Sequence, residues 1–176
     1  MRESTRLVLS GGLFAGLIGY ATVVVFFAIL NLLAGRSPFY TAALFGSALF
    51  FGLEDPAQLA ITPAPVLAYT LVHVLGVLAL GFLASWLVGL AERYPVARFF
   101  ILFVLVFVAG HVYAGLLLFA QPILPGAAWQ VGFGSLLAAV LMGWYLLRLH
   151  PLLRHELKTI PMGDEAEADP AAPRST

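Results

Sequence analysis

Four long apolar segments constrain this chain more than any other feature of its sequence. They cover residues 7–33, 65–90, 97–119 and 127–147, and none of them contains an aspartate, a glutamate or an interior proline. A helix needs about 20 mostly apolar residues to cross the ~30 Å hydrocarbon layer of a bilayer. Each segment is long enough, so the sequence predicts an all-α integral membrane protein with four transmembrane helices.

The composition supports this class and excludes several others. Only 10% of the 176 residues are charged and 61% are hydrophobic, whereas about a quarter of an ordinary soluble domain is charged. The net charge is zero, and no basic stripe with interleaved aromatic residues indicates a nucleic-acid partner. The absence of cysteine excludes disulfides, thiolate metal ligands and a thiol nucleophile. The first apolar run is far longer than the ~7–15 residues of a signal-peptide core, so we expect it to be a retained span.

The segment 37–53 is apolar but short, and the distribution of charge decides how it is interpreted. With four spans, one side of the membrane carries nearly all the basic residues, namely Arg2, Arg6, Arg93, Arg98, Arg148, Arg154, Lys158 and Arg174. The other side carries Arg36 together with Glu54 and Asp55. A fifth span would divide the basic residues between the two sides. Because basic residues favour the cytoplasmic side, we expect four spans, and an external re-entrant or interfacial helix over 37–53.

The same rule places both termini in the cytoplasm. The compact loops and the absence of targeting sequences favour a bacterial inner (plasma) membrane. The bundle is predicted over 1–148, followed by a cytoplasmic tail over 149–176 that begins basic and ends acidic and rich in proline and alanine. We expect Arg148, Arg154 and Lys158 to contact the headgroups of membrane lipids, and the acidic part to be disordered.

Gly12 and Gly16 lie four residues apart in the first span. Small residues at this spacing allow two helix backbones to approach closely within a bilayer, where apolar side chains gain little from leaving lipid. The pair therefore predicts a specific helix contact, either inside this bundle or with a partner protein.

Two histidines, His73 and His111, are the candidate cofactor ligands. Each is an ionisable residue inside a span, which is costly and marks a functional hypothesis. At a rise of ~1.5 Å per residue, both lie about 12 Å below the outer boundary, on antiparallel neighbouring helices. They could serve as axial ligands of haem b or chlorophyll. Gly76 and Gly115 follow them on the same helical faces and would leave room for a flat macrocycle.

The alternative is that each imidazole is a core histidine with a local hydrogen bond. For His73 the candidate partners are Tyr69 and Thr70, four and three residues earlier. Proton transfer is a further option. A bare metal site is disfavoured because the spans provide no carboxylate or thiolate to complete a ligand set. His150 and His155, five residues apart, have a poor spacing for a shared metal.

No enzyme is predicted. The sequence has no nucleophile elbow, zinc-protease, phosphate-loop or dinucleotide motif, and the adjacent Glu54 and Asp55 would point apart on regular structure. We expect a non-catalytic accessory or assembly subunit of a larger membrane complex, respiratory or photosynthetic complexes included, with other membrane proteins as partners. The first alternative is a tetrapyrrole-binding electron-transfer or pigment protein. The second is a small transporter or channel that works as an oligomer.

Overall fold

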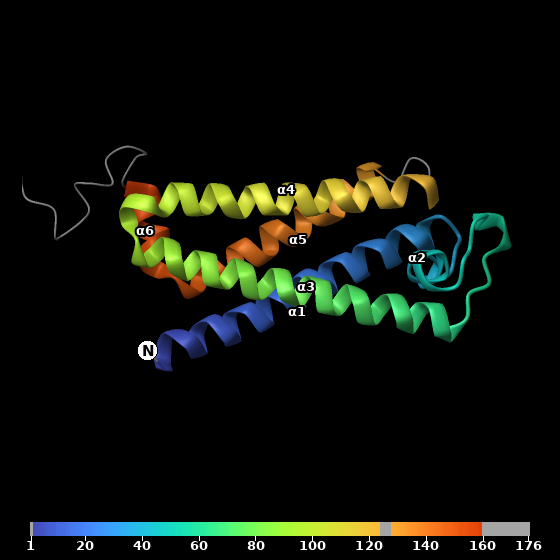
Figure 1. Cartoon of the computed structure of the whole chain (residues 1–176), viewed down its shortest axis with the longest axis horizontal. Helices are drawn as coiled ribbons and strands as arrows, with labels where there is room; N and C mark the ends of the chain where they lie inside the picture. Colours follow the sequence, from blue (N-terminus) through green and yellow to red (C-terminus); the bar gives the residue numbers. More distant parts are fainter. Residues whose placement is uncertain (1, 124–127, 160–176) are drawn as a thin grey trace, which may run out of the picture.

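The computed structural model describes residues 2–123 and 128–159, and every regular element in them is helical. The four long helices are α1 (Arg2–Leu33), α3 (Pro63–Arg93), α4 (Arg98–Ile123) and α5 (Ala128–Leu149). They run back and forth along the bundle (Figure 1), and each contains a stretch long and apolar enough to cross a membrane. The predicted class is confirmed: the chain is an all-α multi-pass membrane protein.

α1 and α3 form the most extensive helix pair, and glycines bring their backbones together. A Cβ atom placed on Gly81 of α3 would lie 2.5 Å from the carbonyl oxygen of Gly12 and 2.6 Å from the nitrogen of Gly16. A Cβ atom on Gly16 would lie 2.9 Å from the Cα atom of Leu78. These distances are too short for any side chain, so the crossing requires glycine on both helices. Gly12 and Gly16 thus pack against α3 of the same chain.

A tight turn carries the chain from α1 into α2 (Tyr40–Phe50). Gly35 has a φ of +68°, the left-handed conformation that glycine adopts just after a helix end. The Asn31 side-chain amide donates to the Thr41 hydroxyl at 2.9 Å, and that hydroxyl donates back to Asn31 Oδ1 at 3.2 Å. Both side chains are buried, so this reciprocal pair fixes the start of α2 against the end of α1.

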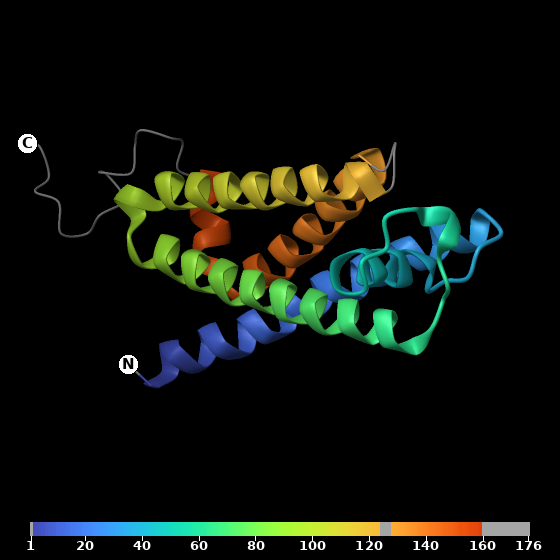
Figure 2. The ribbon, with the colours of Figure 1, turned by 45° about the vertical axis from the view of Figure 1, so that its right-hand side comes forward.

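α2 lies across the bundle instead of along it. Figure 1 shows this helix almost end-on, and Figure 2, turned by 45°, shows more of its length. Its middle, residues 43–47, is buried on all sides, and Gly46 packs directly on the carbonyl group of Pro65 at the start of α3. With 11 residues, α2 is too short to span a bilayer. The predicted segment 37–53 therefore holds a short helix and no fifth span.

The first turns of α4 are its most buried part. It follows α3 through the short 3-10 helix η2 (Pro95–Ala97). Among residues 98–118, whose side chains the structure describes, only Arg98 and Ile101 are buried. Farther along, α4 diverges from α3 in both views (Figures 1 and 2). Beyond Ile101 the described side chains of α4 are half-buried or exposed, although Tyr113 still lies against Gly132 of α5.

After α5 the chain folds back as a short helix, α6 (Pro151–Thr159), between the end of α3 and the start of α4 (Figure 1). Leu153 of α6 is fully buried. It belongs to a hydrophobic cluster to which α1, α3, α4 and α5 also contribute, with Ala15, Ala84, Leu87, Val88, Ala91, Ile101 and Leu146. The structure thus makes residues 151–159 part of the bundle, whereas the sequence interpretation assigned them to a peripheral tail.

The first turns of α1, the α3–α4 connection and α6 gather at one end of the molecule (Figure 1). We call it the basic end, because Arg6, Arg93, Arg98, Arg148, Arg154 and Lys158 lie there. The opposite end, the α2 end, contains α2 and the loop with Glu54 and Asp55 (Figure 1). The start of α1 and the end of α5 both lie at the basic end, as an even number of spans requires. The acidic stretch from residue 160, predicted to be disordered, lies outside the described residues.

Candidate functional site

His73 belongs to a column of aromatic rings that connects three helices. Its ring stacks on Tyr69 with the centroids 5.4 Å apart, and it meets the ring of Tyr20 on α1 edge-on at 5.5 Å. Tyr69 in turn stacks on Phe45 of α2 at 5.7 Å. The imidazole is half-buried and faces α1. The described contacts of the His73 ring are with the rings of Tyr69 and Tyr20. Tyr69, one of the two hydrogen-bond partners expected for His73, stacks on the imidazole instead.

His111 has a different environment, because its side chain is exposed on α4. Its ring packs on Phe107 with the centroids 4.0 Å apart, and Nδ1 lies 2.9 Å from the Phe107 carbonyl oxygen. A carbonyl oxygen accepts only, so Nδ1 carries the hydrogen, and a neutral ring then has Nε2 as a free acceptor. No side chain among residues 5–94, 96–118 and 129–159, the ones whose side chains the structure describes, bonds to this Nε2 atom.

The two predicted ligands make no direct contact with each other. No hydrogen bond or ring contact joins His73 to His111 in the described part of the chain. A Cβ atom on Gly76 or Gly115 would meet no atom of another element within 4 Å, so the space beside both glycines is open. The two imidazoles therefore make different contacts in this structure, and the haem or chlorophyll hypothesis stays a prediction. The described residues also hold no group of three or more histidine or acidic side chains near enough to share a metal ion.

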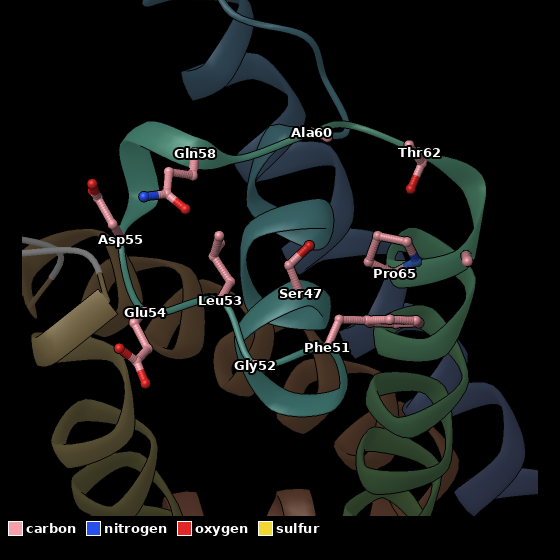
Figure 3. A pocket seen from close by; sticks show the side chains of 11 residues that line it. Ser47, Phe51, Gly52, Leu53, Glu54, Asp55, Gln58, Ala60, Thr62 and Pro65 are labelled. Atoms are coloured by element: carbon pink, nitrogen blue, oxygen red, sulfur yellow. The ribbon is translucent and has the colours of Figure 1, made fainter.

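A hollow of about 500 Å³ lies at the α2 end. Figure 3 shows it between the last turn of α2, the loop that follows and the first turn of α3. Ser47 and Thr62 line it, but the carboxylates of Glu54 and Asp55 point away from its centre (Figure 3). Asp55 instead accepts a hydrogen bond from the Ala57 backbone N–H at 2.9 Å and thereby caps the 3-10 helix η1 (Pro56–Gln58). The hollow has no converging charged groups that would indicate a ligand or a reaction.

The exposed side of α4 around His111 combines one polar acceptor with small residues. Gly110, Ala114 and Gly115 are all exposed, and a Cβ atom on either glycine would meet no other atom within 4 Å. Together with Phe107 and His111 they form what we call the α4 face. On this face a second helix could approach the α4 backbone closely, and the free Nε2 atom could accept a hydrogen bond from it. The α4 face is the candidate site.

The basic end contains two ionic contacts that the sequence interpretation missed. His150 Nδ1 lies 2.5 Å from Glu92 Oε2, and Arg98 Nη1 lies 3.2 Å from Glu156 Oε2. His150 and Arg98 are both buried. The signal in the sequence was the helical spacing of Leu153, Leu157 and Glu156, which puts apolar and acidic groups on one side of α6.

The three predicted lipid-contacting residues are all exposed. The Arg148 guanidinium lies 3.8 Å from the centroid of the Trp144 ring, and Arg154 and Lys158 lie on the outer side of α6. An arginine over an exposed tryptophan is an arrangement suited to the boundary between headgroups and acyl chains.

Comparison of the chain with known protein families, with curated proteins and with solved structures found no match. The helices establish the class, a multi-pass membrane protein. A more specific function has to be argued from the geometry of the α4 face and the basic end.

Proposed function

We propose that this protein is a non-catalytic accessory or assembly subunit that binds another membrane protein through the α4 face. The observation that carries the proposal is the exposed His111, whose Nε2 atom has no partner within the described residues. Within a bilayer, lipid tails offer no hydrogen-bond donor to this acceptor. A transmembrane helix of a partner protein with a serine, threonine or asparagine would provide one.

The free energies involved favour such a contact. Leaving a polar group without a hydrogen bond in an apolar medium costs roughly 2–7 kcal/mol, depending on the reference state. Hydrogen bonds between transmembrane helices contribute about 0.6–2 kcal/mol, and close packing over Gly110 and Gly115 adds dispersion contacts. An individual contact of this kind is weak, which agrees with a subunit that is held by one helix face.

The proposal includes a location and an orientation. We place the chain in a bacterial inner membrane with the basic end in the cytoplasm, and the gathering of arginine and lysine at that end supports the orientation. In this orientation α2 and the hollow beside it face the outside of the cell.

The proposal is tested by affinity purification of the tagged protein from its native membranes in mild detergent, after crosslinking. We expect a defined membrane protein to co-purify with the natural chain. His111→Leu, which removes the acceptor, and Gly115→Leu, which blocks close approach, should each reduce the recovered partner severalfold. His111→Gln keeps an acceptor at this position and should retain most of it.

Gly143→Leu on α5 is the matched control. A Cβ atom on Gly143 would likewise meet no other atom within 4 Å, and Gly143 lies on a different helix. This substitution should leave the partner bound. Recovery of the natural chain as a lone monomer would refute the proposal. An equal effect of Gly115→Leu and Gly143→Leu would refute the assignment to the α4 face.

A further inference from the structure

The acidic side chains described at the basic end are paired inside the protein. Glu92 contacts His150, and Glu156 contacts Arg98. Both partners of the carboxylates are buried: His150 is 2% exposed and Arg98 is 0% exposed. These two carboxylates are therefore oriented toward groups within the bundle, and they are not arranged to pair with the exposed cations around them.

Several cations at this end have no acidic partner. Arg6, Arg93, Arg148, Arg154 and Lys158 are exposed, and none of them forms an ion pair with a side chain of residues 5–94, 96–118 or 129–159, where side chains are described. Like charges at one end of a molecule repel each other unless counter-charges are present. In a membrane protein the nearest source of negative charge is the phospholipid headgroup.

The packing of α6 determines which way its basic side chains point. Leu153 points into the core and holds one side of the helix against the bundle. Arg154, His155 and Lys158 lie on the exposed side. Lys158 is four residues after Arg154 and three after His155, spacings that make it a neighbour of both on the helix surface. Leu152, at the start of the helix, is 67% exposed. A cationic face next to an exposed apolar residue is the pattern of a helix that lies in the membrane interface.

The end of α5 continues the same surface. Trp144 is exposed, and the Arg148 guanidinium lies over its ring. An indole ring prefers the level of the headgroups, and a guanidinium can bind a phosphate through two parallel N–H groups. Arg148 therefore lies where a phosphate of the adjoining leaflet would be found.

We propose that α6 and the last turn of α5 form a binding surface for anionic phospholipid headgroups, with Arg148, Arg154 and Lys158 as the phosphate-binding side chains. Glu92 and Glu156 are positioning residues in this surface, because they hold α6 in place and do not neutralise its outer face. The surface selects anionic over zwitterionic phospholipid. This inference concerns the basic end and is independent of the α4 face.

The test uses Trp144 as a local reporter in the full-length protein. The substitutions Trp86→Phe and Trp129→Phe leave Trp144 as the single tryptophan, and the protein is reconstituted into vesicles of phosphatidylcholine and phosphatidylglycerol. The fluorescence of Trp144 is then quenched with brominated versions of either lipid at equal mole fraction. We expect brominated phosphatidylglycerol to quench Trp144 severalfold more strongly than brominated phosphatidylcholine does at the same mole fraction. High salt should reduce this difference in quenching.

Two controls make the result specific. A protein with Trp129 as its single tryptophan reports on the other end of α5, and both brominated lipids should quench it equally. Arg154→Gln with Lys158→Gln, in the Trp144 protein, should abolish the preference, whereas Arg154→Lys with Lys158→Arg keeps both charges and should retain it. Arg148 is left unchanged because it contacts the reporter ring.

Equal quenching of Trp144 by the two lipids would overturn the proposal. A preference that survives Arg154→Gln with Lys158→Gln would overturn the assignment to α6. Far-ultraviolet circular dichroism and thermal unfolding of each variant show that a lost preference reflects lost charge and not an unfolded chain.

Discussion

At the scale of single residues, Gly81 is the position where a side chain would be least tolerated in the α1–α3 crossing. Its Cβ atom would lie within 2.7 Å of backbone atoms of Gly12 and Gly16, and backbone cannot move aside as a side chain can. We expect Gly81→Ala to reduce the free energy of unfolding by about 1–3 kcal/mol, measured by thermal unfolding in detergent. Gly76→Ala on the same helix meets open space and should be neutral or slightly stabilising. Equal melting temperatures would contradict the crossing geometry.

The Asn31–Thr41 pair is a second residue-scale feature with a measurable energy. Asn31→Ala leaves the buried Thr41 hydroxyl without this partner, at a cost of about 1–3 kcal/mol. Thr41→Val should cost a similar amount. Because each substitution removes the same pair of hydrogen bonds, the double variant should lose clearly less than the sum of the two single losses. Strict additivity in a denaturant titration would show that the two side chains are not coupled.

At the scale of elements, α6 depends on docking, because an isolated helix of nine residues is too short to be stable in water. Leu153→Ala removes its fully buried side chain, and such a change costs about 2–5 kcal/mol in a packed core. We expect α6 to detach more often, so that trypsin cleaves faster after Arg154 and Lys158. Leu152→Ala changes an exposed neighbour and should leave the cleavage rate unchanged. The same rate in both variants would mean that Leu153 does not hold α6 in place.

At the scale of the whole molecule, the topology predicts which residues share a side of the membrane. The chain has no cysteine, so single-cysteine variants can be labelled without background. With a membrane-impermeant maleimide, Ala57→Cys should react in intact cells, whereas Thr5→Cys and His155→Cys should react only after permeabilisation. Opposite accessibility of the Thr5 and His155 positions would contradict the fold. If Thr5→Cys and His155→Cys reacted in intact cells and Ala57→Cys only after permeabilisation, the fold would stand and the proposed cytoplasmic orientation of the basic end would be wrong.

The number of spans could be predicted because it depends on local properties. A transmembrane helix satisfies its own backbone hydrogen bonds, so length and hydropathy are enough to identify it. The segment 37–53 could be separated from the spans because it is short and because a fifth span would divide the basic residues between the two sides of the membrane. The exact helix ends could not be predicted in this way. α3, for example, continues beyond its apolar segment through the polar residues Glu92 and Arg93.

The candidate site could be predicted only in part. His111 was singled out as an ionisable residue inside a span, but its pairing with His73 was inferred from depth alone. Depth gives no information about rotation around a helix axis. In the structure His73 faces Tyr20 on α1, and His111 is exposed. Likewise, the sequence did not distinguish Gly81, which is packed against another backbone, from Gly76, which is not.

The sequence by itself determined that this chain crosses a membrane as helices, how many times, and which end is rich in arginine and lysine, because these properties are read residue by residue along the chain. The tertiary structure decided which residues meet. Glu92 with His150 and Arg98 with Glu156 are each separated by 58 positions, and nothing local relates them. These contacts form only when α6 folds back onto the α3–α4 connection, and they fix which charges are buried and which remain on the surface.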